Sequence, residues 1–171
     1  MPFRGSGILW GFLPVFADAE LGLSSTKIGI LVTVGILTSG LLQTPMGFAA
    51  DLVSKKRLVV SGGLVGGFAL AAFYGVRGFG DIFIISVLFG VGGGISMPAL
   101  NALAVMRGNH FGAMGSVMAL MNLSQSLGML LGSLVAGVMM DALYLRVAFP
   151  AGSLLMFVVS VVFAVRFRNP A

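Results

Sequence analysis

The chain has 171 residues, of which 58% are hydrophobic and only 9% are charged, with a formal net charge of +5. A soluble domain usually carries about a quarter of charged residues, so this composition excludes an ordinary soluble protein and predicts an integral membrane protein. The pI near 10.5 would suggest nucleic-acid binding in a soluble chain. Cations in the loops of a membrane protein are explained better by the positive-inside rule, so no nucleic-acid partner is expected.

Charged and turn residues divide the sequence into apolar blocks that predict an all-α protein with six transmembrane helices in one domain. About 20 apolar residues in a helix span the hydrocarbon core of a bilayer. The expected helices cover residues 3–18, 26–50, 57–77, 82–106, 112–140 and 145–166. The first block has only 13 uncharged residues between Arg4 and Asp18. It is therefore either completed by residues 1–4 or the remainder of a truncated helix.

The first block also has features of a secretory signal peptide. Arg4 precedes a short apolar run, and Ala17-Asp18-Ala19 has the form of a cleavage site. Multi-pass proteins rarely need such a peptide, and Trp10 and Pro14 are equally typical of a kinked membrane helix. We therefore favour a membrane helix here.

The distribution of cations predicts the orientation of the chain in the cell membrane. With six spans, both termini lie on one side, and this side holds seven of the ten cations. The seven are Arg4, Lys55, Lys56, Arg57, Arg107, Arg166 and Arg168. Because cytoplasmic loops carry the excess of Lys and Arg, both termini are expected in the cytoplasm.

Glycines recur four residues apart in three of the expected helices. The pairs are Gly62 with Gly66, Gly63 with Gly67, Gly90 with Gly94, and Gly128 with Gly132. Small residues at this spacing let membrane helices approach closely where lipid offers no hydrophobic driving force. The pattern predicts a tightly packed bundle.

The polar hairpin after the second expected helix recurs in part later in the chain. Each copy has the pattern Gly-x3-Asp-x4-basic at the end of a long apolar block. The matched positions, 90 residues apart, are Gly47, Asp51 and Lys56 with Gly137, Asp141 and Arg146. The copies lie three spans apart and so face opposite sides of the membrane. An inverted three-plus-three repeat predicts this arrangement, and such repeats are typical of secondary transporters.

The hairpin resembles the signature of major facilitator superfamily transporters, Gly-x3-Asp-[Arg/Lys]-x-Gly-[Arg/Lys]-[Arg/Lys]. Gly47, Asp51, Lys55 and Lys56 match this signature, whereas residue 52 is leucine and residue 54 is serine. Residues 128–137 are similar to the antiporter motif Gly-x3-Gly-Pro-x2-Gly-Gly of the same superfamily. Serine replaces its proline at residue 133, and alanine replaces its first late glycine at residue 136. The resemblance covers nearly the whole chain.

This resemblance implies a twelve-helix fold, of which the chain supplies one six-helix half. The degenerate hairpin and the short tail after the last helix favour the C-terminal half. The second half is then expected either in the same full-length chain or as another subunit. A fragment, a split gene and a truncated sequence all remain open.

The resemblance also implies roles for individual residues. Gly47, Asp51, Lys55, Lys56 and Arg57 would form a gating motif, in which the aspartate pairs with a cation or a helix N-terminus in one conformation only. For the three cations, a purely topogenic role is an equally good explanation. The expected helix-packing motif consists of Gly128, Gly132 and Gly137.

The family analogy assigns the first and fourth helices to the cavity and the second and fifth to the interface between halves. The candidate substrate-facing residues are Trp10, Phe12, Phe16, Met97 and Asn101. The candidate interface residues are Gln43, Asn122 and Gln125, whose buried amides need hydrogen-bond partners in lipid.

The leading hypothesis is a secondary active transporter that moves a small organic or drug-like solute by alternating access. The apolar, aromatic cavity candidates favour an efflux role, and residues 128–137 resemble the motif of antiporters. No acid, lysine or arginine lies in the middle of a block, so a proton carrier would belong to the other half. Alternatives are a self-sufficient homodimeric half-transporter and a structural membrane fragment. A membrane-embedded enzyme lacks the residues, since the chain has one histidine and no cysteine. No catalytic residue, cofactor or metal is expected.

Overall fold

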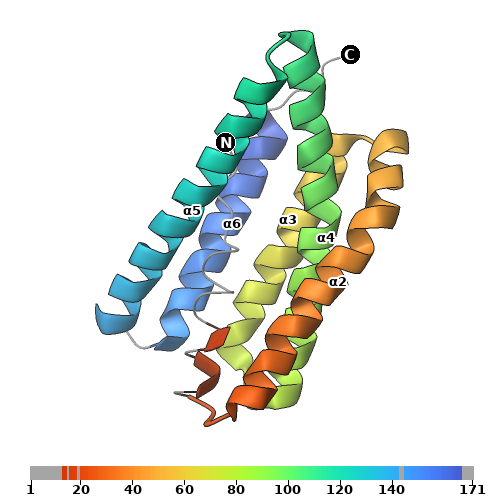
Figure 1. The fold of residues 1–171 in the computed structure, drawn as a ribbon. Coiled ribbons are helices and arrows are strands. Elements are labelled where there is room, and N and C mark those ends of the chain that lie inside the picture. Colours follow the sequence, from red (N-terminus) through yellow and green to blue (C-terminus); the bar gives the residue numbers. More distant parts are fainter. Residues whose placement is uncertain (1–12, 15, 19, 143–144, 167–171) are drawn as a thin grey trace.

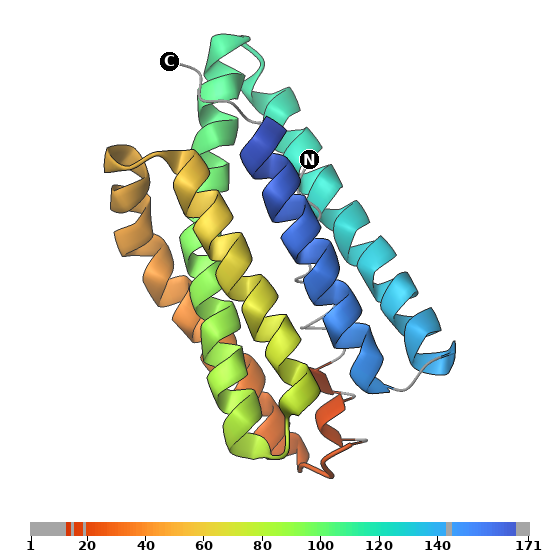
Figure 2. The same ribbon diagram turned by 180° about the vertical axis from the view of Figure 1, so that it is seen from behind.

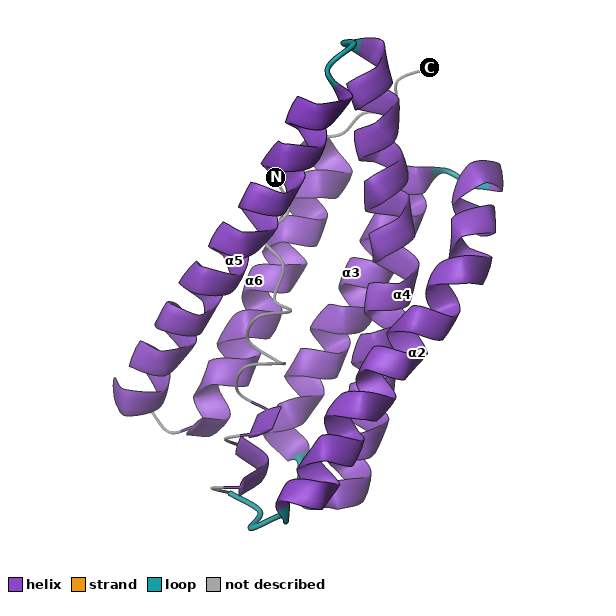
Figure 3. Cartoon of the chain, in the orientation of Figure 1, coloured by secondary structure: helices purple, strands orange, loops and turns teal. Residues whose placement is uncertain are grey.

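The computed structural model describes residues 13–14, 16–18, 20–142 and 145–166, and every regular element among them is a helix (Figure 3). The long helices are α2 (Ser25–Leu52), α3 (Lys55–Ala72), α4 (Phe79–His110), α5 (Met114–Ala142) and α6 (Leu145–Arg166). A short 3-10 helix, η1 (Phe73–Gly75), extends α3. The predicted all-α architecture is confirmed for these residues, whereas most of the first expected helix lies outside them.

The helices have the length and composition of membrane spans. Four of them are long and apolar enough to cross a bilayer, namely α2, α3 continued by η1, α4, and α5 over Met114–Leu134. Residues Gly152–Arg166 of α6 form a further, shorter apolar helix. The expectation of a multi-pass membrane protein is therefore supported by the structure.

Successive helices run in opposite directions, so that the connections alternate between the two ends of the bundle (Figures 1 and 2). The α2–α3 and α4–α5 connections lie at one end, where α6 also finishes. We call this the basic end because it carries Lys55, Lys56, Arg57, Arg107 and Arg166. The short connections leave no space for a separate domain between the helices.

The bounds of α4 differ from those expected from the apolar block, residues 82–106. The helix begins three residues earlier, because the Asp81 carboxylate accepts hydrogen bonds from the backbone N–H groups of Arg77 (2.8 Å) and Gly78 (3.2 Å). It continues past Arg107 to His110 and ends where Gly112 adopts a positive φ of 59°. Charged residues thus end the apolar span without ending the helix.

The centre of the bundle is α4, which lies between α2 and α3 (Figure 1). Glycines bring the three backbones into contact. A methyl group added at Gly92 would lie 2.7 Å from the Gly62 carbonyl oxygen of α3, and one at Gly62 would lie 2.6 Å from the Gly92 oxygen. On the other side, a methyl group at Gly94 would lie 2.7 Å from Leu42 Cβ of α2. The predicted close approach is confirmed for α3 and α4.

Helix α3 also packs against α6. Two clusters of buried apolar side chains lie near the two ends of the bundle. Phe68 of α3 and Phe157 of α6 form an edge-to-face ring contact with centroids 5.0 Å apart. One cluster lies inside the bundle near the end opposite the basic end. It includes Phe16, Leu31, Leu70, Phe73 and Ile82. A smaller cluster near the basic end contains Ala50, Val59, Ala99 and Phe163. These contacts fix α3 and α4 as the buried helices.

Replacing Gly92 by alanine tests the backbone contact. The added methyl group would meet backbone atoms of Gly62 and Gly66, which cannot move aside as a flexible side chain does. We expect Gly92→Ala to lower the free energy of unfolding by about 1–3 kcal/mol, measured by SDS titration of the protein in detergent micelles.

Gly29→Ala is the matched control, because nothing lies within 4 Å of a methyl group there. Its higher helix propensity should leave the protein unchanged or more stable by up to about 1 kcal/mol. Equal stability losses in the two variants would show that the glycine contact does not organise the bundle.

Candidate functional site

A two-residue turn joins α2 to α3 at the basic end. The Val53 N–H donates to the Ala49 carbonyl at 2.8 Å and closes the last turn of α2. The Ser54 carbonyl accepts from the N–H groups of Arg57 (2.9 Å) and Leu58 (3.3 Å), which starts α3. The turn is therefore short, and it holds an acid and a basic cluster at adjacent helix ends.

Asp51 lies in the last turn of α2 with an exposed side chain. Among the residues that the structure describes, no ion pair joins it to Lys55, Lys56 or Arg57 in this conformation. Gly47, one turn earlier, has nothing within 4 Å of the position that a Cβ would occupy. The gating motif is thus assembled on one surface, with its carboxylate available to a partner from outside this helix pair.

The related position after α5 is seen only in the backbone. Asp141 is the penultimate residue of α5, and Arg146 is the second residue of α6. Asp51 and Lys56 occupy the same positions at the end of α2 and the start of α3. The orientation of the Asp141 and Arg146 side chains lies outside the described part of the chain.

The expected substrate-facing residues are distributed over different environments. Trp10 and Phe12 lie outside the described residues. Phe16 is fully buried, and its ring meets Phe73 edge to face with centroids 5.7 Å apart. On α4, Met97 is partly buried and Asn101 is exposed. The structure therefore brings Phe16 into an apolar cluster and leaves Asn101 as the accessible polar group.

The expected interface residues lie on the two outer helices, α2 and α5. The side chains of Gln43 and Asn122 are exposed, and Gln125 is partly buried. The two exposed residues, Gln43 and Asn122, lie well inside apolar helices, where an exposed amide cannot hydrogen-bond to lipid. These amides therefore require water or another protein segment.

The described side chains of α6 show the opposite pattern. Between residues 152 and 165, its exposed positions are all aliphatic, namely Leu154, Leu155, Val158, Val161, Val162 and Val165. Its serines, Ser153 and Ser160, are buried. This is the distribution expected of a helix whose outer face contacts lipid tails.

Of the expected packing glycines on α5, Gly128 is buried and Gly132 is partly buried. At Gly137, a Cβ would have nothing within 4 Å.

Metal binding requires several ligands close together. Within the described residues, no three His, Asp or Glu side chains come together closely enough to hold an ion.

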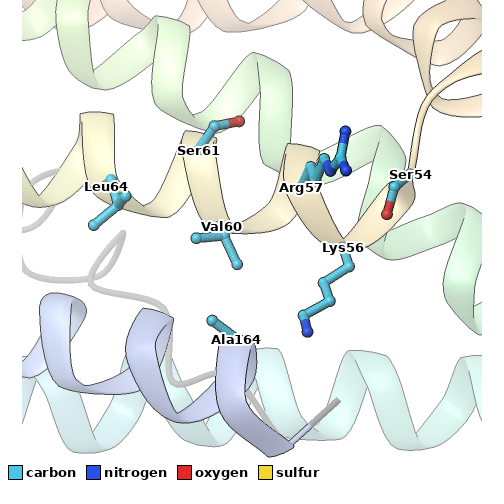
Figure 4. Close-up of a pocket in the computed structure, with 7 residues that line it drawn as sticks. All are labelled: Ser54, Lys56, Arg57, Val60, Ser61, Leu64 and Ala164. Carbon is cyan, nitrogen blue, oxygen red and sulfur yellow. The ribbon is translucent and has the colours of Figure 1, made fainter. Parts of the chain in front are cut away.

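A groove between α3 and α6 near the basic end was not predicted from the sequence. It has a volume of about 390 Å³ and is lined by Ser54, Lys56, Arg57, Val60, Ser61 and Leu64 of α3 together with Ala164 of α6 (Figure 4). The spacing of Lys56, Val60 and Leu64 places them on one helix face. Only the spatial pairing of α3 with α6 turns this face into a groove.

These features define a multi-pass helical membrane protein with exposed amides on two outer helices. The family model that matches the chain is the Major Facilitator Superfamily, over residues 3–171. The chain therefore belongs to this superfamily, as the hairpin and the α5 motif indicated.

Two relatives have transport or resistance roles in their names. The chain is 32% identical over 136 residues to the lysophospholipid transporter LplT of Klebsiella pneumoniae, which covers 75% of this chain and 33% of LplT. It is 26% identical over 170 residues to the quinolone resistance protein NorA of Staphylococcus aureus, covering 94% of this chain and 41% of NorA. The chain thus spans between a third and two fifths of the length of these relatives.

Cysteine labelling tests whether Asn101 faces water. The chain has no natural cysteine, so a single introduced thiol can be followed without background. We expect Asn101→Cys to react with a water-soluble maleimide on the order of tenfold or more faster than Val158→Cys, because the thiolate forms readily only where it is hydrated. Rates would be measured in intact vesicles. Similar labelling rates at the two positions would show that residue 101 does not face water.

Proposed function

We propose that the chain is one six-helix half of a secondary active transporter that moves a small organic solute by alternating access. The observation that carries the proposal is the presence of exposed amides on α2 and α5. A protein in lipid does not leave such groups facing the hydrocarbon. A second six-helix body, packed against these helices, would give the amides partners and would form a solute path between the two bodies.

The helix ends support an inverted three-plus-three repeat. Moving α2 and α3 forward by 90 residues places their junction, Leu52 to Lys55, on Ala142 to Leu145, where α5 ends and α6 begins. The two junctions lie at opposite ends of the bundle (Figure 1). The α3–α6 pair would then lie on the pseudo-two-fold axis, because the repeat exchanges these two helices.

The gating motif supports alternating access through the charge on Asp51. The C-terminal end of a helix carries a partial negative charge, so a carboxylate in the last turn of α2 is unfavourably placed. Pairing with a helix N-terminus or a cation of the second body would relieve this cost in one conformation. When the transporter opens at the basic end, the interaction between Asp51 and the second body would break. The open and closed conformations would then have different free energies.

Orientation follows from the cations at the basic end. We place this end, and both termini, on the cytoplasmic side of the cell membrane, because cytoplasmic loops are enriched in Lys and Arg. Lys27 and Arg77 lie at the opposite end, together with the acids Asp18, Glu20 and Asp81.

The nature of the solute is indicated only as a class. LplT is named for lysophospholipids and NorA for quinolone resistance, and both kinds of compound have large apolar parts. A partly apolar organic solute also suits a path in which Met97 and Asn101 of α4 combine an apolar and a polar contact.

Reconstitution tests the proposed function. The full-length protein would be placed in lipid vesicles and its flux of lysophospholipid or a fluoroquinolone measured with and without an ion gradient. We expect gradient-dependent flux, and a particle mass in detergent that corresponds to twelve helices per unit. A mass of two copies of this chain alone would identify the homodimeric alternative. Absence of flux for both solutes with every imposed gradient would favour a structural role.

Neutralising Asp51 tests the gate. Asp51→Asn retains the shape of the side chain but loses a charge-assisted interaction worth about 1.5 kcal/mol. We expect transport to slow about tenfold, because the balance between the two conformations changes by this energy, while membrane insertion stays normal. Initial flux per inserted molecule would be measured.

Asp18→Asn is the matched control, since Asp18 is an exposed acid away from the basic end. Its flux should equal that of the unmodified protein. If Asp51→Asn also transports at the normal rate, the carboxylate does not act as a gate.

A further inference from the structure

The groove between α3 and α6 is not explained by a solute path along α4 or by a partner packed on α2 and α5. Its outer end is cationic, with Lys56 and Arg57, and its inner part is apolar, with Val60, Leu64 and Ala164. In Figure 4, Lys56 extends from α3 towards α6, whereas Arg57 lies on the other side of the first turn of α3. The groove therefore changes from charged to aliphatic along its length.

The polar groups at the outer end are suited to an anion. Among the described residues, none that lines the groove is acidic, and none provides Lys56 with a carboxylate partner. The Ser54 hydroxyl makes no capping hydrogen bond, and the first turn of α3 contains no acid. By contrast, the Ser61 hydroxyl donates to the Leu58 carbonyl at 3.1 Å and is already occupied.

The apolar part of the groove is suited to an acyl chain. Lys56, Val60 and Leu64 follow one another at successive turns, so the lining extends about 12 Å along α3 from the charged end, at 1.5 Å per residue. The exposed residues of α6 beside Ala164 on the helix surface are Val161 and Val165. Figure 2 shows α3 and α6 side by side on the face of the bundle turned away from α2 and α5 in Figure 1. The groove thus opens where α6 presents its aliphatic face.

We propose that this groove binds an anionic glycerophospholipid of the adjacent leaflet, with the phosphate group at Lys56 and an acyl chain along Val60 and Leu64. Arg57, on the other side of the first turn of α3, adds to the positive charge at this end of the groove. Charge complementarity carries the choice of occupant. Basic pockets between transmembrane helices at the cytoplasmic surface bind anionic headgroups, and the cytoplasmic leaflet supplies such lipids. A neutral zwitterionic lipid would gain only the apolar contact. The bound lipid would contact both α3 and α6.

Lipid titration of the full chain in neutral detergent tests this site without a transport measurement. Phosphatidylglycerol or phosphatidylcholine would be added, and bound lipids counted by native mass spectrometry. We expect phosphatidylglycerol to bind preferentially. Lys56→Gln should weaken its binding about fivefold, and Lys56→Gln with Arg57→Gln roughly twentyfold, from the contribution of each cation near an anionic headgroup. Equal retention of the two lipids by the unmodified protein would overturn the proposal.

Lys55→Gln is the matched control, because Lys55 is adjacent in sequence and equally charged but does not line the groove. It should retain normal phosphatidylglycerol binding, and a loss equal to that of Lys56→Gln would indicate diffuse charge instead of a site. Ala164→Leu keeps every charge and narrows the groove, so it should also weaken binding; unchanged binding would exclude the groove.

Inorganic phosphate separates a lipid site from a site for free anions. At millimolar concentration, phosphate should not displace phosphatidylglycerol, because it lacks the apolar contact with Val60 and Leu64. Displacement would assign the site to a soluble anion and overturn the lipid proposal. Since none of these readouts depends on flux, they can fail or succeed independently of the proposed transport function.

Discussion

The contact of backbone with backbone around α4 is the constraint on which the rest of the structure depends. In lipid, burial of apolar side chains gives helices little reason to associate, so close packing must supply the free energy. Gly92 and Gly62 allow α4 to meet α3, and Gly94 allows it to meet α2 on its other side. A three-helix core therefore forms around close contacts at glycines, and the remaining helices are arranged around it.

The outer helices expose different kinds of side chain. Helix α6 hides Ser153 and Ser160 and exposes aliphatic side chains, as expected for contact with lipid tails. Helices α2 and α5 instead expose Gln43 and Asn122 at depths where lipid cannot satisfy them. The distribution of polar groups, more than the total exposed area, distinguishes a surface that meets lipid from one that needs water or a protein partner.

Much of this arrangement follows from the sequence, because hydropathy, glycine spacing and the Asp51 hairpin are local signals. The family membership follows from the same residues. The extension of α4 to His110 was not predicted, since backbone hydrogen bonds continue after the apolar span has ended. The burial of Phe16 against Phe73 and the groove at Lys56 were also missed, because each depends on segments that are distant in the chain and meet only in the folded bundle.

The two-residue turn at the basic end connects two proposals that rest on different observations. It places the Asp51 carboxylate on α2, the helix assigned to a protein partner, and the Lys56 ammonium on α3, which borders the groove with α6. Because only Val53 and Ser54 separate the two helices, the end of α2 cannot move far without moving the first turn of α3. A lipid bound between α3 and α6 would therefore change the energy of any gate that moves α2. Coupling of this kind requires only a short turn between two charged helix ends.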